Sequence, residues 1–313
     1  MIRTGAFPIR RFHFVYLALL LILASLTQSG AQPRLAGGRA QPYPDAPTND
    51  KVYESSYRDG IVEIFNSRGM FEGLLAKVVH PTGLVFDPAG NLYVASNHRS
   101  NFSIKKILVD GTVTTFADST LLDGPHGLAL DSRGNLYVAN SAGDSIVKFT
   151  PAGVGAFFAD RHDGLTEPIS LAFDAAGILY VSNANGGAPG SNGRVLKFTP
   201  DGVGSVFNET DFQSAYGLAL DPDGNVYVSN NAGNTVEKFA PDGTDLGLFA
   251  SSGLNAPLGI MFDRKGNLYV ANEGNNTIER YSRNGIDLGV FATTHEGPHF
   301  LALLSSSTSE PED

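Results

Sequence analysis

The stretch PHGLALDSRGNLYVAN, from Pro125 to Asn140, decides the fold because close variants of it recur along the chain. The variants are PTGLVFDPAGNLYVAS from Pro81, PISLAFDAAGILYVSN from Pro168, AYGLALDPDGNVYVSN from Ala215 and PLGIMFDRKGNLYVAN from Pro257. The aspartate of each copy lies 42 to 47 residues from the aspartate of the next copy. A period of about 40 to 50 residues is typical of repeat proteins in which each unit is one supersecondary element.

Each repeat contains four strand signals separated by turn residues. In the copy that starts at Pro125, we expect short strands over 127–130, 136–139, 145–149 and 155–158. Glycines between them favour tight turns, because glycine accepts the positive φ that such turns require. No segment of the repeat region has a sustained 3.6-residue period, so few helices are expected. Four antiparallel strands per unit predict an all-β chain built of propeller blades.

The two ends of the repeat region complement each other. Residues 51–75 align with residues 267–291, which cover the second, third and fourth strands of a unit, and residues 298–303 supply the missing first strand. Together with the five whole units, this predicts a six-bladed β-propeller over residues 51–304, closed by a blade that the N- and C-termini share. Closure of this kind leaves no open sheet edge between the first and last units.

The segments outside the repeats predict export. Three arginines precede an apolar run over residues 15–26, and small residues follow at 29–31, so residues 1–31 are interpreted as a signal peptide. The apolar run is shorter than the roughly 20 residues that a membrane-spanning helix needs, so no permanent membrane anchor is expected. Residues 32–50 are interpreted as a flexible leader and residues 305–313 as an acidic tail. We therefore expect an exported monomer, periplasmic or secreted.

The composition limits the partners. The 313 residues include 22 basic and 32 acidic side chains, and removal of residues 1–31 lowers the net charge from −10 to −13 because it removes three arginines and no acid. A chain this acidic repels phosphate backbones, so nucleic acid is not an expected partner. The sequence contains no cysteine, so the core must be stabilised by burial without a disulfide framework.

Antiparallel order places the start of each first strand and the end of each second strand at one face of the disk. Just before the first strands, the residues expected to ring the channel mouth are Thr82, His126, Ile169, Tyr216, Leu258 and His299. At the ends of the second strands lie Asn140, Asn183, Asn230 and Asn272, with Ser56 and Ser96 in the remaining blades. We predict ligand-binding roles for Thr82, Tyr216 and the four asparagines, and expect that the asparagines also bridge the loop that follows them. The loop over residues 184–193 is six residues longer than its counterpart after Asn230, and it is interpreted either as a tolerated insertion or as a mobile rim over the channel.

The pattern PxGLAxDxxGNLYVAN, followed by NxxIxKF, resembles the NHL-repeat propellers over nearly all of the mature chain. Many NHL units have an aspartate after the YVA strand and an arginine before the third strand. Here asparagine or serine occupies the first of these positions, so the charged pair is lost. The resemblance implies the same propeller fold.

Two histidines of the channel mouth leave an enzymatic alternative open. Imidazoles of His126 and His299 could hold a divalent metal such as zinc, calcium or magnesium, with His126 as the catalytic residue. The arrangement is similar to that of peptidyl-hydroxyglycine amidating lyases, and the gluconolactonase, senescence-marker and virginiamycin B lyase propellers also use a metal at the channel. His80 lies two residues before Thr82 and is displaced from the ring. The sequence thus supports two functions: an exported module that binds a small molecule or protein at the channel face, and a metal-dependent lyase or lactonase.

Overall fold

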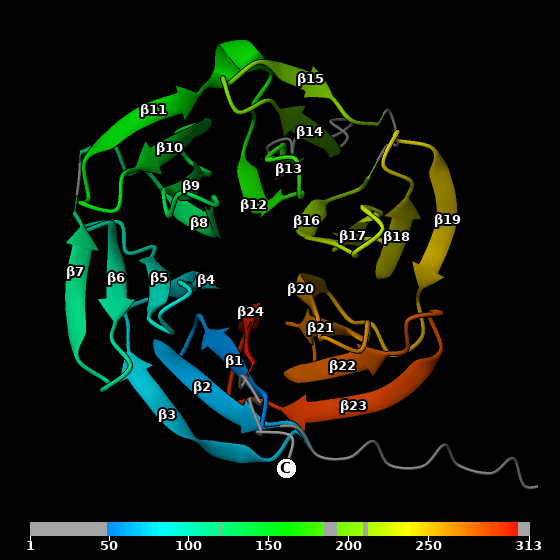
Figure 1. Ribbon diagram of the computed structural model, residues 1–313. Helices are drawn as coiled ribbons and strands as arrows, with labels where there is room; N and C mark the ends of the chain where they lie inside the picture. Colours follow the sequence, from blue (N-terminus) through cyan, green and yellow to red (C-terminus); the bar gives the residue numbers. More distant parts are fainter. Residues whose placement is uncertain (1–48, 119, 185–192, 209–211, 306–313) are drawn as a thin grey trace, which may run out of the picture. The chain divides into compact units, whose positions relative to one another are not determined.

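The protein forms a ring of six four-stranded antiparallel sheets (Figure 1). The computed structural model describes residues 49–118, 120–184, 193–208 and 212–305, and within them the only helix is one short 3-10 turn, η1 (Arg161–Asp163). No helix in these residues is long and apolar enough to cross a membrane. The prediction of an all-β, six-bladed propeller is therefore confirmed. The predicted signal peptide, most of the leader, the long loop over 185–192 and the tail from 306 lie outside the described residues.

We number the blades in chain order and give the strands of each from the axis outward. Blade 1 consists of β24 (Pro298–Leu304), β1 (Lys51–Ser56), β2 (Ile61–Asn66) and β3 (Phe71–Lys77). Blade 2 consists of β4 (Pro81–Phe86), β5 (Leu92–Ser96), β6 (Ser103–Ile107) and β7 (Val113–Ala117). Blade 3 consists of β8 (Pro125–Leu130), β9 (Leu136–Asn140), β10 (Ser145–Phe149) and β11 (Gly155–Ala159).

The remaining three blades follow the same plan. Blade 4 consists of β12 (Pro168–Phe173), β13 (Leu179–Asn183), β14 (Arg194–Phe198) and β15 (Gly204–Val206). Blade 5 consists of β16 (Ala215–Leu220), β17 (Val226–Asn230), β18 (Thr235–Phe239) and β19 (Asp245–Ala250). Blade 6 consists of β20 (Pro257–Phe262), β21 (Leu268–Asn272), β22 (Thr277–Tyr281) and β23 (Asp287–Thr293).

Blade 1 joins the two ends of the repeat region, as the alignment predicts. Strand β24, red in Figure 1, pairs antiparallel with the blue β1, and the register sets Val52 opposite Leu303 and Glu54 opposite Leu301. The inner strand of this blade thus comes from the C-terminal end of the described chain and its other three strands from the N-terminal end. This pairing closes the ring without leaving an inner sheet edge unpaired.

A glycine in the repeat allows the inner strands to approach each other near the axis. A Cβ added to Gly127 would lie 2.4 Å from the carbonyl oxygen of Ile169 in the next blade, and one added to Gly217 would lie 2.2 Å from that of Leu258. Real side-chain atoms do not approach backbone oxygens this closely. The glycine of the PxGL motif is therefore needed for close packing of neighbouring inner strands, which explains its recurrence.

The aspartate of the repeat organises the turn between the first and second strands. In blade 3 the Oδ1 atom of Asp131 accepts hydrogen bonds from the backbone nitrogens of Arg133 at 2.9 Å and Asn135 at 2.8 Å. Gly134 completes the turn with φ of 77°. The side chain thus satisfies backbone donors that the turn would otherwise leave free, which is why D-x-x-G returns in every whole unit.

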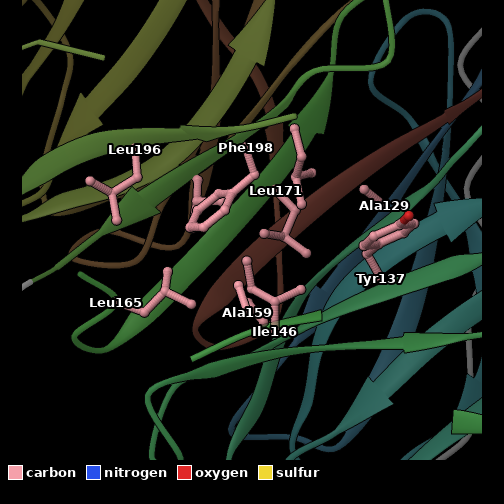
Figure 2. Close-up of a cluster of buried hydrophobic side chains, with 11 residues drawn as sticks. Ala129, Tyr137, Ile146, Ala159, Leu165, Leu171, Leu196 and Phe198 are labelled. Carbon is pink, nitrogen blue, oxygen red and sulfur yellow. The ribbon is translucent and has the colours of Figure 1, made fainter. Parts of the chain in front are cut away.

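The core lies between the blades, where tyrosines of the second strands contact phenylalanines of the neighbours. The ring of Tyr137 in blade 3 packs edge-on against Phe173 of blade 4, with centroids 5.0 Å apart. Figure 2 shows the surrounding cluster, in which Ile146 and Ala159 of blade 3 face Leu171 of blade 4. Such contacts hold the disk rigid, so residues at the channel mouth occupy fixed positions.

Candidate functional site

The six residues predicted to ring the channel mouth all lie on the inner strands, as the second residue of each. They are thus inside the strands, and not before them as the sequence suggested, because each strand begins at the preceding residue. Thr82, Ile169 and Leu258 are buried, at 0%, 2% and 2% exposure. His126, Tyr216 and His299 come from the three alternate blades 3, 5 and 1, so small or aliphatic side chains separate the three rings.

The three aromatic side chains converge. The ring centroids of His126 and His299 are 5.6 Å apart, those of Tyr216 and His299 are 5.5 Å apart, and those of His126 and Tyr216 are 6.4 Å apart. The Tyr216 hydroxyl and the Nε2 atom of His299 form a hydrogen bond of 2.7 Å, whose direction depends on the imidazole tautomer. The structure therefore brings together three side chains that the sequence placed on one ring.

This cluster is uncharged at neutral pH. Burial lowers the pKa of His126 to about 4. Burial, and then the nearby His126, hold the pKa of His299 well below its usual value. Burial likewise raises the pKa of the Tyr216 hydroxyl well above its ordinary value. Both imidazoles are neutral, and the Nδ1 atom of each is buried without a hydrogen-bond partner in the described part of the chain.

The two histidines do not form a metal site by themselves. Within the described residues, no group of three or more His, Cys, Asp or Glu side chains is placed to hold a metal ion. Zinc sites in proteins use at least three protein ligands even when one position stays open for water. The Nε2 atom of His299 is also engaged with Tyr216. The described residues at the mouth therefore supply two imidazoles and no third ligand for zinc, and the metal site stays a prediction.

The four asparagines at the ends of the second strands are buried and bind the backbone of the loop before their own blade. The Oδ1 atom of Asn140 accepts from the backbone nitrogen of Asp123 at 3.2 Å, and its Nδ2 atom donates to the carbonyl oxygen of Leu121. Equivalent bonds join the other asparagines to residues 16 to 19 positions earlier, as Asn183 to Thr166 and Gly164, Asn230 to Ser214, and Asn272 to Asn255 and Gly253. The expectation that they bridge the following loop is thus wrong, because the loop entering the blade is nearer to the end of its second strand. Their predicted ligand-binding role stays a prediction.

Thr82 is similarly engaged. Its hydroxyl donates to the backbone carbonyl of Pro125 at 2.9 Å and so links the inner strands of blades 2 and 3. The hydroxyl is buried between these strands, and its predicted contact with a ligand also stays a prediction.

A cavity of about 450 Å³ opens beside the three-ring cluster, at the channel-mouth ends of blades 1, 2 and 3. Its lining consists of Tyr57, His80, Asn97, His98, Arg99, Phe102, Gly124, His126, Ser141 and Ala142. His126 is the member that belongs to the ring of inner-strand residues. All the others lie in the loops that join strands at this face, as is usual for binding residues carried by a rigid scaffold.

Two rings of the lining, Tyr57 and His80, belong to a stack of three rings. Tyr57 lies between His80, with centroids 4.9 Å apart and planes at 21°, and His299, with centroids 5.2 Å apart and planes at 26°. His98 continues the series, with its centroid 5.4 Å from that of His80. This stack connects the cavity to the three-ring cluster, because His299 contacts both Tyr57 and His126.

The backbone of His80 follows the repeat, and only its side chain is unusual. Its φ of 45° lies in the left-handed region, and the residues before the first strands of four other blades share that region, at Gly124, Glu167, Ala256 and Gly297. The positive φ is therefore a requirement of the entry to the blade and no sign of function. The imidazole that projects into the cavity is what distinguishes this blade.

Sequence reasoning missed the part of the cavity that blade 2 builds. Six residues separate β5 from β6, from Asn97 to Phe102, where four separate β9 from β10 in blade 3. The two extra residues belong to a loop that contributes His98, Arg99 and Phe102 to the lining. The extra length was visible in the alignment of repeats, but the proximity of this loop to His126 was not.

A second unusual group lies in blade 1, against the inner strand that bears His299. Glu54 is fully buried, at 0% exposure, in the position where the other five blades have a fully buried valine, namely Val94, Val138, Val181, Val228 and Val270. Its Oε1 atom accepts a hydrogen bond of 3.3 Å from the backbone nitrogen of His299. Burial, and then the neighbouring Glu63, raise the pKa of Glu54 well above its usual value.

Glu63, opposite Glu54 in the register of β1 and β2, holds the segment that leads into β24. Its Oε2 atom accepts from the backbone nitrogen of His295 at 3.1 Å, and its Oε1 atom contacts the Nδ1 atom of the same residue. The carboxyl groups of Glu63 and Glu54 thus join residues that are 232 and 245 positions apart in the sequence. These contacts therefore both hold the closing segment in place and fix the position of His299.

Comparisons with known proteins agree on the fold. No family model matches the chain, and no curated protein matches its sequence. A chain in the crystal structure of a nidogen/laminin complex aligns with a TM-score of 0.71 and 18% identity over 81% of this chain and 98% of that chain. The X-ray structure of a candidate gluconolactonase aligns with a TM-score of 0.61 and 19% identity over 70% of this chain and 80% of that chain. At such identities the likeness concerns the six-bladed propeller fold, and membership of the NHL family remains a prediction.

Proposed function

We propose that this protein binds a small organic ligand in the cavity at the channel-mouth ends of blades 1, 2 and 3. The observation that carries the proposal is the cavity itself. Its volume of about 450 Å³ falls within the range of roughly 300–1,000 Å³ typical of small-molecule sites. Its lining combines aromatic rings with several side chains that can form hydrogen bonds, and both kinds of group occur in such sites.

The state of His126 supports the same proposal. Its imidazole lines the cavity, and its buried Nδ1 atom has no partner among the described residues. That atom has no accessible surface, but the residue as a whole is only half-buried and lines the cavity, so a ligand can pack against the accessible part of the ring.

The alternative function, a metal-dependent lyase or lactonase, has less support from the geometry. That chemistry requires a bound divalent ion, and the described residues bring no group of three His, Cys, Asp or Glu side chains together to hold one. The fold does not decide between the two functions, because propellers of this kind bind partners in some proteins and catalyse reactions in others. The binding function needs only the cavity.

A cavity-filling substitution tests the proposal. Ala142→Trp places an indole at the exposed rim of the cavity, and Ala232→Trp places the same group at the corresponding position of the β17–β18 loop in blade 5, away from the lining. A library of small-molecule fragments would be screened by ligand-observed NMR against the wild type and both variants. We expect fragments whose binding is lost in Ala142→Trp and kept in Ala232→Trp. Absence of hits, or hits that Ala142→Trp leaves unchanged, would overturn the proposal.

We also propose that the protein is exported. The support is the succession of basic, apolar and small residues over positions 1–31. N-terminal sequencing of protein recovered from the periplasm or the medium should begin at or near Gln32. An intact Met1 on a cytoplasmic product would contradict this proposal.

A further inference from the structure

The cavity lining contains basic side chains and no acidic one, although the protein as a whole is acidic. The whole chain has a net charge of −10, yet the ten lining residues include one arginine and three histidines and no aspartate or glutamate. Their side chains offer hydrogen-bond donors on several sides, including the amide of Asn97 and the hydroxyls of Ser141 and Tyr57. A lining of this kind favours a ligand that accepts hydrogen bonds and carries negative charge.

Arg99 is the fixed charge of this lining. Many basic side chains elsewhere in the structure are paired with carboxylates, as in Lys51 with Glu72, Arg58 with Glu273, and Lys106 with Asp87. Arg99 makes no ion pair or hydrogen bond with the residues that the structure describes, although surface carboxylates are abundant. Its guanidinium therefore remains free to form two parallel hydrogen bonds with a carboxylate, the geometry that arginine matches best.

The aromatic residues of the lining supply the second requirement. The ring of Phe102 and the stacked pair of Tyr57 and His80 give the cavity flat apolar surfaces beside the donors. Because Tyr57 is held between two imidazoles, its ring keeps a fixed orientation and loses little conformational entropy when a ligand binds. Flat surfaces of this kind accept planar or weakly polar carbon skeletons.

We propose that the ligand of this cavity is a small organic carboxylate whose flat, weakly polar body packs on the Phe102 and Tyr57 side while its anionic group pairs with Arg99. This inference rests on the proposed function and specifies the chemical class of its ligand. The loop that is two residues longer in blade 2 is then the element that confers specificity, since it brings Arg99 and Phe102 to the cavity together. His126 belongs to the same lining, on the inner strand β8, and offers a further ring to the body of the ligand.

Matched probes test the class of ligand. Benzoate, cinnamate and 4-hydroxybenzoate would each be compared with the corresponding neutral amide by chemical-shift titration at constant ionic strength and neutral pH, because salt screens exposed charges. In the wild type we expect each carboxylate to bind about ten-fold more tightly than its amide, since a hydrogen bond to a charged group contributes about that much. The Ala142→Trp variant should bind neither the carboxylates nor the amides.

Two substitutions assign the preference to one side chain. Arg99→Gln should remove the preference for carboxylates over amides and leave amide binding within about two-fold of the wild type. Arg133→Gln is the matched control, because Arg133 is an exposed arginine in the β8–β9 turn, outside the lining, and this variant should retain the full preference. Arg99→Lys should show an intermediate preference, because lysine keeps the charge but lacks the planar fork.

The outcomes separate this inference from the proposed function. If amides bind as tightly as carboxylates and Ala142→Trp blocks both, the cavity is a ligand site but the inference about its class is wrong. If carboxylates bind preferentially but neither Ala142→Trp nor Arg99→Gln affects them, the anion binds elsewhere and the inference is also wrong. If no probe of either kind binds while the fragment screen yields cavity ligands, the class is again refuted and the function stands.

Discussion

Blade 1 and blade 6 share one plan of strands and one register, but they differ in chemistry at their second strands. In blade 6 the register sets Val270 opposite Glu279, and in blade 1 the equivalent pair is Glu54 opposite Glu63. The residue that follows is also apolar in blade 6 and polar in blade 1, namely Ala271 on β21 and Ser55 on β1. Blade 6 is continuous in sequence, and blade 1 is assembled from two distant segments.

Three consecutive polar residues at the end of β1 contact the segment that completes blade 1. Ser55 accepts a hydrogen bond of 3.0 Å from the backbone nitrogen of Phe300, the Ser56 hydroxyl donates to the carbonyl oxygen of Glu296, and Glu54 accepts from the nitrogen of His299. Hydrogen bonds are directional, so these contacts specify where β24 docks, which apolar packing alone does more loosely. The difference suggests that the closing blade gains specificity of pairing at the expense of stability, because a buried carboxyl is costly.

The largest expected effect follows from removal of the closing strand. Truncation after Gly297 removes β24, whose buried Leu301 and Ala302 pack in the apolar clusters between blade 1 and its two neighbours. We expect a loss of about 5 kcal/mol or more in the free energy of unfolding, comparable to the whole stability of many domains. Truncation after Ser305 keeps β24 and serves as the control. Urea unfolding followed by circular dichroism measures both, and an unchanged midpoint in the shorter chain would show that closure is dispensable.

An intermediate effect is expected when blade 1 is given the residue of blade 6. Glu54→Val places the valine of the other five blades in this slot, and we expect it to raise the free energy of unfolding at neutral pH by about 1–3 kcal/mol. The reverse change, Val270→Glu, should destabilise the protein, because it buries a carboxyl without the backbone donor of His299. Urea midpoints of the two variants test the contrast. A less stable Glu54→Val protein would show that the carboxyl stabilises the closure by more than its burial costs.

A smaller effect concerns the pH dependence that Glu279, on the third strand of blade 6, gives to stability. Burial, and then the nearby Asp287, raise the pKa of Glu279 to about 7. A carboxyl with a raised pKa contributes stability that is fully present below its unfolded pKa of about 4.5 and is lost as the pH rises through about 7. The free energy of unfolding should therefore fall between pH 5 and pH 8 by about 1–2 kcal/mol more in the wild type than in Glu279→Gln. Parallel pH profiles for the two proteins would contradict the assignment.

The smallest expected effect concerns the inner strands, where blade 1 has His299 and blade 6 has Leu258. Because His126 and His299 have no third metal ligand among the described residues, a chelator should leave the melting temperature of the wild type unchanged. The double variant His126→Ala, His299→Ala should respond identically. A chelator-induced decrease that the double variant lacks would restore the metal-dependent alternative.

The sequence predicts the fold well because the features that build it recur. The Gly127 slot, the Asp131 turn and the Tyr137 contact each appear in most blades, so one copy explains the others. Even the closing blade was predictable, since each terminus lacks the strands that the other provides. The strand limits in blade 3 differ from the expected ones by two residues or fewer at each end.

The site was only partly predictable, because it consists of departures from the repeat. The antiparallel order of the strands predicts that one ring of residues contains His126, Tyr216 and His299. Their convergence could not be predicted, because it depends on large side chains in alternate blades. Tyr57 and His98 lie in loops whose paths the repeat does not specify. The burial of Glu54 was detectable by alignment with Val270, but its contact with His299 depends on the pairing of two strands that are 245 residues apart.

The most direct test of the central claim, that the cavity beside His126 binds a ligand, is a histidine-resolved NMR titration. The Hε1–Cε1 signals of the histidines would be assigned by single substitution and followed during titration with the best carboxylate or fragment. We predict that the signals of His80, His98 and His126, which line the cavity, move together with one affinity, while those of His162 and His295, which lie outside the lining, stay in place. Equal movement of His162 or His295, or a saturating ligand that moves none of the three cavity signals, would contradict the account.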